Sequence, residues 1–258
     1  MNTKDLHSDN AGELSGKNSH PLTEVAATMS LGGLFSGLTM WVAGAAWGRS
    51  HHRHHLFQNA VMISGVVGAV SGLLAGKQKM YAWSTRRGRL AFVADHTWAM
   101  VTTGMGAITA GLNYLLGATV DESLTRRQNR LVFDRGFVLR PGFAVSVGYV
   151  VSGAADRQGV VTPRRRKLVE VHEDVHIWQA RRWGPLYPVL YSLWFIGGFF
   201  VGLQRWWVRR HDGRSLMTHI DATAYYSNPF EWRAYTEDDN WPPTTADKAL
   251  VWSKRFGG

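Results

Sequence analysis

Four long stretches of the chain contain no charged residue and are rich in apolar side chains: residues 25–48, 56–76, 97–120 and 183–204. Each is close to the roughly 20 residues that an α-helix needs to cross a bilayer core. A soluble helix of this length would carry charged residues along one face at helical spacing, and these stretches carry none. The pattern therefore predicts helices that cross or enter a membrane. Buried helices of a soluble bundle are the alternative.

Small residues recur one helical turn apart in the first three stretches, most regularly at Ser64, Gly68, Gly72 and Gly76. This spacing lets helix backbones approach closely in lipid. We therefore expect a three-span transmembrane region over residues 25–120, preceded by a disordered polar tail over the first 24 residues. Asp95 and His96 border the third stretch. There we expect an interfacial helix start, with a proton-linked pair as the alternative.

The charged residues lie between these stretches and are mostly basic, with a formal net charge of +10. Basic residues crowd positions 77–89, which is typical of a cytoplasmic loop. Three spans would then place residues 121–182 outside, although that region is also rich in arginine, and for this reason we favour the cytoplasmic face for it. Residues 49–55 hold four histidines that could bind a metal, with a basic interfacial turn as the other interpretation. No nucleic-acid reading motif accompanies the basic charge, so we expect the bilayer, rather than a nucleic acid, as partner.

Short apolar runs predict a few strands after residue 120. The runs 131–133 and 137–139 flank Asp134-Arg135-Gly136, a pattern typical of a hairpin. Residues 143–151 alternate larger and smaller side chains and predict another strand. We therefore expect a mainly α, multi-span helical membrane protein with a small antiparallel β element, and a second region over residues 121–258 that includes a membrane-embedded or interfacial segment at 183–207.

The segment 168–179 contains the pattern His-Glu-x-x-His. On a helix, His172 and His176 lie one turn apart and face the same way, so the two imidazoles could bind one zinc ion. Glu173 beside them could take a proton from a water that the metal activates. Apolar residues recur at helical spacing through the same segment, at Leu168, Val171, Val175 and Trp178. The chain has no cysteine, so any metal would be held by histidine or carboxylate ligands.

This segment resembles the active-site helix of the zincin metallopeptidases. The resemblance implies Zn²⁺ on His172 and His176, with Glu173 as the catalytic base. In the gluzincin version the third ligand is a glutamate on a later helix. Glu231 is the matching candidate, because Asn228 followed by proline is a typical helix start. Three other residues remain alternatives for this position: His211, His219 and Asp221.

Together with the later Asn-Pro-x-Glu segment, the motif resembles membrane-associated bacterial zincins over about residues 130–236. The metzincin extension is absent, because Gln179 and Arg182 stand where it has glycine and histidine. In zincins a strand before the active-site helix binds extended substrate, and residues 143–151 match it. Asp174 could orient a ligating imidazole. Four residues are candidate donors to an oxyanion: Tyr225, Tyr226, Tyr235 and His219.

These features predict a multi-pass protein of the plasma membrane that hydrolyses peptide or membrane-protein substrates as a zinc-dependent endopeptidase. One alternative is a non-catalytic scaffold or envelope-assembly protein that keeps the fold. Another is a metal sensor or transporter that uses the histidines between residues 51 and 55.

The apolar stretch 183–204 lies between the histidine pair and Glu231, and this raises a topological difficulty. A single crossing of the membrane would put Glu231 on the opposite side from the histidines. We favour a re-entrant or interfacial segment that bends at Gly197-Gly198. The other solutions are a full crossing followed by a return through the protein, or a glutamate that is not a ligand.

Overall fold

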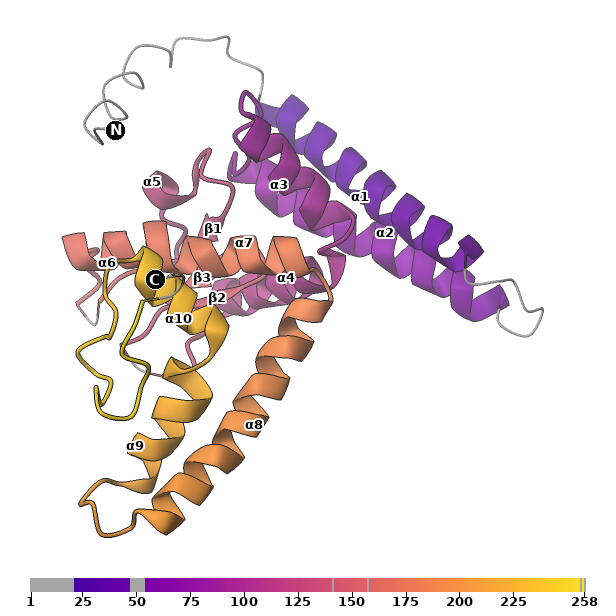
Figure 1. Ribbon diagram of the computed structural model, residues 1–258. Helices are drawn as coiled ribbons and strands as arrows, with labels where there is room; N and C mark the ends of the chain where they lie inside the picture. Colours follow the sequence, from indigo (N-terminus) through magenta and orange to yellow (C-terminus); the bar gives the residue numbers. More distant parts are fainter. Residues whose placement is uncertain (1–20, 47–53, 141, 157, 256, 258) are drawn as a thin grey trace.

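The computed structural model describes residues 21–46, 54–140, 142–156, 158–255 and 257. Figure 1 shows a mainly helical protein in which two helical arms extend from a body that holds a small sheet. Among the described residues, three helices are long and apolar enough to cross a membrane: Leu22–Ala46, His55–Lys77 and Leu186–Val208.

The first arm is an antiparallel pair formed by α1 (Pro21–Ala46) and α2 (His54–Lys77). Their glycines face one another across the pair. A Cβ on Gly68 would lie 2.3 Å from the Gly32 carbonyl oxygen, and a Cβ on Gly72 would lie 2.2 Å from that of Thr28. Side chains at these positions would force the two backbones apart. The predicted close packing of small residues is therefore confirmed for these two helices.

The third apolar stretch does not form a third long helix, which corrects the prediction of three spans within residues 25–120. Helix α3 (Arg86–His96) ends where that stretch begins, and α4 (Met100–Leu115) has 16 residues. Its buried face carries threonines and Asn113, and a Cβ on Gly106 would lie 2.9 Å from the Val147 carbonyl oxygen. One face of α4 packs on the sheet with small and hydroxyl side chains, and its other face exposes apolar side chains such as Val101, Ile108 and Leu112.

The sheet is mixed, so the prediction of an antiparallel element is only partly right. It has the order β1-β3-β2, in which β1 (Leu131–Val132) runs parallel to β3 (Val150–Ser152), and β2 (Val145–Val147) runs antiparallel to β3. The expected hairpin at residues 131–139 is wrong, because residues 137–139 form no strand. The expected strand over residues 143–151 is divided by a turn at Gly148, whose φ of +58° suits glycine. A short helix, α5 (Glu122–Thr125), precedes β1.

The His-Glu-x-x-His motif lies on the long helix that the sequence predicts. Thr162 caps its start, and α6 (Pro163–Lys167), a π-helical turn η2 (Leu168–Glu173) and α7 (Asp174–Trp183) follow without a break. The expected apolar stripe at Leu168, Val171, Val175 and Trp178 is only half-buried, whereas Val169 and Ile177 are fully buried. The wide π turn changes the spacing of side chains around the helix axis, so the regular α-helical stripe does not coincide with the buried face.

The second arm is formed by α8 (Leu186–Val208) and by a return along it through α9 (Leu216–Ile220) and a second π-helical turn, η3 (Asp221–Tyr226). Helix α8 is uninterrupted, so the bend that we favoured at Gly197-Gly198 is wrong. Gly198 instead allows close packing, since a Cβ there would lie 2.5 Å from Ala224 Cα. The return ends at α10 (Pro229–Glu237), beside the helix that carries the histidines.

Candidate metal centre

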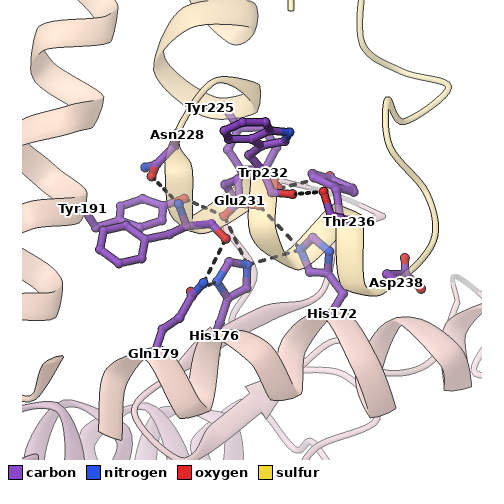
Figure 2. Close-up of polar contacts among 12 residues, drawn as sticks. His172, His176, Gln179, Tyr191, Tyr225, Asn228, Glu231, Trp232, Thr236 and Asp238 are labelled. Carbon is purple, nitrogen blue, oxygen red and sulfur yellow. Dashed lines mark hydrogen bonds and ion pairs between the residues drawn. The ribbon is translucent and has the colours of Figure 1, made fainter. Parts of the chain in front are cut away.

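Two imidazoles and one carboxylate meet in a buried position between η2–α7 and α10. Figure 2 shows His172 and His176 facing Glu231 across the gap between the helices. The two Nε2 atoms are 3.2 Å apart. Glu231 Oε2 lies 3.5 Å from His172 Nε2, and Glu231 Oε1 lies 3.3 Å from His176 Nε2. Within the described part of the chain, these three residues form the group that could hold a metal ion.

These distances match the edges of a zinc coordination polyhedron. Ligand atoms bound to zinc at about 2.0–2.1 Å in tetrahedral geometry lie roughly 3.3 Å from one another. The observed separations of 3.2, 3.3 and 3.5 Å bracket that value. The donor set of two histidines and one glutamate is also one that zinc accepts in catalytic sites, where a fourth position stays open.

Local hydrogen bonds orient His176 for this role. Gln179 Nε2 donates to the Phe230 carbonyl at 3.1 Å, which turns Gln179 Oε1 toward the imidazole. His176 Nδ1 lies 2.9 Å from Oε1 and therefore carries the proton. Its Nε2 faces Glu231, and loss of the proton from this nitrogen would leave the lone pair through which histidine binds metals.

An unpartnered carboxylate oxygen supports the fit of a cation. Glu231 is 4% exposed. Its Oε1 accepts a hydrogen bond of 2.8 Å from the Tyr191 hydroxyl, whereas Oε2 is buried without any hydrogen-bond partner. Buried carboxylate oxygens are costly unless they are paired. A cation between the imidazoles and Glu231 would satisfy this atom.

The charges of the site reinforce one another. Burial alone would lower the pKa of His176, but the Glu231 carboxylate outweighs it and raises the pKa to about 9. Conversely, burial alone would raise the pKa of Glu231, but the two imidazoles hold it well below its usual range. The pocket thus favours an anionic carboxylate facing positive charge, and a metal ion that binds there competes with a proton.

Glu173 lies at the end of the π turn, next to His172, and is 4% exposed. Its charge raises the pKa of both His176 and Tyr235, which places its carboxylate within electrostatic range of the site. Within the described residues its carboxylate makes no hydrogen bond or ion pair with another side chain. It therefore differs from Glu231, whose oxygens face the imidazoles.

Three contacts hold the helices of the site together. At one end of α10, Gln179 reaches the backbone beside Glu231, as described above. At the other end, Asp238 accepts two hydrogen bonds from Arg164 of α6, at 2.9 and 2.7 Å. Behind α7, Arg181 forms a buried two-point ion pair with Asp95 of α3, at 2.8 Å for each contact. The expected interfacial helix start at Asp95 and His96 is wrong, because both residues are buried in the last turn of α3, where the Asp95 carboxylate anchors the histidine-bearing helix.

The candidate oxyanion donors fall into two groups. The Tyr235 ring packs against His172 with ring centroids 4.4 Å apart, and the Tyr225 hydroxyl lies 3.4 Å from that of Tyr235. Both residues thus border the site. The Tyr226 hydroxyl instead lies 2.7 Å from Thr245 Oγ1, and His219 lies on α9 with its Nε2 3.4 Å from Asp212. The structure does not bring these last two to His172, His176 and Glu231.

The rivals for the third ligand position lie elsewhere. Asp221 forms an ion pair of 3.3 Å with Arg140, and His211 is exposed on the turn between α8 and α9. The expected role of Asp174 in orienting an imidazole is not seen, because its carboxylate pairs with Arg87 and Arg130 at 2.6 and 2.8 Å. Most of the segment 49–55, with its histidines, lies outside the described residues.

Two tyrosines of α8 contribute to the site without having been predicted. Tyr191 binds Glu231, and the Tyr187 hydroxyl lies 3.3 Å from His176 Nδ1. They lie one helical turn apart in an otherwise apolar stretch, and this spacing could have indicated that both hydroxyls lie on the same face of the helix. Strand β2, which lies within the residues 143–151 expected to bind substrate, is at an edge of the sheet.

Comparison of the chain with protein-family profiles, with curated protein sequences and with solved structures gives no match. The functional argument therefore rests on the residues of the site and on their geometry.

Proposed function

We propose that the protein is a membrane-anchored zinc-dependent endopeptidase that hydrolyses peptide bonds in peptides or membrane proteins. The observation that carries this proposal is the convergence of His172, His176 and Glu231 at separations of 3.2–3.5 Å. Zinc in this position would supply a Lewis acid and would lower the pKa of water toward ~7.

The chain's own residues then divide the remaining work. Glu173 accepts the proton of the attacking water and passes it to the leaving amine. Tyr235, whose ring lies against His172, donates a hydrogen bond to the oxyanion that forms from the carbonyl oxygen. Tyr191 and Gln179 hold Glu231 and His176 in orientation. Strand β2 offers an edge along which an extended peptide could lie.

For the membrane part, we propose that α1, α2 and α8 are the membrane elements of a multi-pass protein of the plasma membrane. Most side chains of α8 are exposed and apolar, as its length and composition suit a span. Because α9 and η3 return along α8, the two helices that hold the ligands stay on one side of the bilayer. We place this site on the cytoplasmic face, where the basic loop at residues 77–89 would also lie.

Metal analysis of the full-length protein, purified in detergent, tests the metal site. We expect stoichiometric zinc in the wild type and in His211→Ala, the control with an exposed histidine, and its loss in His172→Ala. Absence of zinc after incubation with the metal would refute the site and leave a scaffold role.

Cleavage of fluorogenic peptides tests the chemistry separately. We expect Glu173→Gln to retain zinc and lose cleavage. Glu170→Gln is the matched control, because Glu170 is an exposed glutamate on the same helix that pairs with Arg166 at 3.4 Å. Equal cleavage by Glu173→Gln and the wild type would refute the assignment of the base.

A further inference from the structure

A groove of about 430 Å³ runs along α8 beside η3, separate from the metal ligands. Its α8 wall includes Leu193, Trp194, Gly197 and Val201, and Trp252 of the C-terminal segment also lines it, with its ring edge-to-face against Trp194 at 6.2 Å between centroids. Its volume lies in the range of sites for small organic ligands. Because the rest of α8 exposes apolar side chains, the groove opens onto the surface that we assign to the bilayer.

Apart from Arg205, the polar side chains that line the groove are already hydrogen-bonded within the protein. The Thr223 hydroxyl donates to the Gly198 carbonyl at 2.6 Å, and the Ser227 hydroxyl donates to the Ala222 carbonyl at 2.7 Å. Trp194 Nε1 donates to the Thr223 carbonyl at 3.3 Å. A peptide in this groove would bury backbone groups that find no partner there. A hydrocarbon chain makes no such demand.

One charged residue, Arg205, lines the groove at its end nearest the C-terminus of α8. It is exposed, and its side chain makes no ion pair or hydrogen bond with another residue in the described part of the chain. Trp206, Trp207 and Arg209 surround it in sequence. Tryptophan and arginine in this combination are typical of the headgroup region of a bilayer, and arginine binds phosphate well.

Gly197 forms open floor in the groove. A Cβ at this position would meet no atom within 4 Å, in contrast to Gly198 one residue later, whose Cβ would collide with η3. Close packing of α8 against η3 thus requires a glycine at position 198, whereas the absence of a side chain at Gly197 keeps the groove open.

We propose that this groove binds one anionic phospholipid, with an acyl chain along α8 beside the packed rings of Trp194 and Trp252 and the phosphate at Arg205. The proposal depends on the membrane contact of α8 and is independent of zinc and of peptide cleavage.

Native mass spectrometry of the full-length protein tests this site. The detergent-purified protein is mixed with equal amounts of phosphatidylglycerol and phosphatidylcholine, and the retained lipid is counted. We expect one phosphatidylglycerol on the wild type and at least tenfold less on Gly197→Leu, which fills the groove. Gly111→Leu is the control, because a Cβ on Gly111 of α4 also meets nothing within 4 Å. Leu193→Trp narrows the groove from its exposed wall and gives a second blocking variant.

The charge is tested by Arg205→Gln, with Arg209→Gln as the matched control outside the groove. We expect Arg205→Gln to bind the two lipids equally and Arg209→Gln to keep the preference for phosphatidylglycerol. Retention that is unchanged in both Gly197→Leu and Leu193→Trp would overturn the proposal. So would displacement of phosphatidylglycerol by equimolar oleate, which would indicate a free fatty acid, or by an apolar helical peptide, which would indicate a polypeptide ligand.

Discussion

Replacing Gln179 with leucine should weaken zinc binding without removing a ligand. Gln179 is 6% exposed, and its amide joins two helices, since Oε1 accepts from His176 Nδ1 at 2.9 Å and Nε2 donates to the Phe230 carbonyl at 3.1 Å. Leucine has a similar size but can make neither bond. The imidazole would lose the partner that keeps its Nε2 toward Glu231.

The expected magnitude follows from these two contacts. A buried hydrogen bond contributes about 0.5–1.5 kcal/mol, so the loss of both costs about 1–3 kcal/mol. The Tyr187 hydroxyl, 3.3 Å from the same Nδ1, remains as a weaker partner and places the effect toward the lower end. Only the part of this cost that falls on the zinc-bound state lowers the affinity. Since about 1.4 kcal/mol corresponds to a factor of ten, a part of that size lowers zinc affinity roughly tenfold, as is usual for residues that orient metal ligands.

Competition with a chromophoric chelator would measure the affinity. Gln179→Glu keeps an acceptor for His176 and should lose less affinity than Gln179→Leu. Gln204→Leu is the control, because Gln204 is an exposed helical glutamine. An affinity of Gln179→Leu within a factor of two of the wild type would refute the argument that this amide orients the imidazole.

Three further predictions concern the helices and the charge of the site. Asp95→Ala should lower the free energy of unfolding by about 3–5 kcal/mol in denaturant, because it leaves the buried Arg181 guanidinium without its ion-pair partner. The double variant Asp95→Leu with Arg181→Met removes both charges and should recover most of this stability. Equal losses of stability in the two variants would contradict the reasoning. Gly202→Leu should detach α9 from α8, because a Cβ at this position would lie 2.7 Å from Ile220 Cα at the end of α9. A protease should then cut the turn at residues 209–215, and a wild-type cleavage pattern would refute this. Zinc affinity should rise with pH up to about 9, because the proton that zinc displaces from His176 leaves more readily as the pH approaches the raised pKa of that residue. Calorimetry in buffers of different ionisation enthalpy should detect the release of this proton. A zinc affinity that does not change with pH would contradict the prediction.

Local patterns predicted the parts of the site that depend on neighbours in sequence. The one-turn spacing of His172 and His176 requires only a helix, and the helix is present. Asn228 caps α10 through a 3.0 Å hydrogen bond from the Phe230 backbone, with Pro229 in the first turn, so Glu231 lies where a capped helix places it.

Features that depend on tertiary packing were missed. Residues 97–120 were interpreted as a full membrane span, although α4 has 16 residues and packs its small and hydroxyl residues against the sheet. The paired glycines Gly197 and Gly198 suggested a bend, although one of them serves helix packing and the other is open. The π turns also escaped prediction, because no side-chain pattern distinguishes five-residue from four-residue hydrogen bonding.

The connection between the two ligand-bearing helices is the second arm itself, which extends from Leu186 in α8 to Tyr226 in η3. A divalent ion bound by residues of both η2–α7 and α10 would therefore link the two ends of that arm and hold them together. By mass action, such an ion at 100 times its dissociation constant would add about 2.7 kcal/mol to the stability of the closed form. Insertion of the second arm into lipid and binding of the metal would then be thermodynamically coupled, so that each would make the other more favourable.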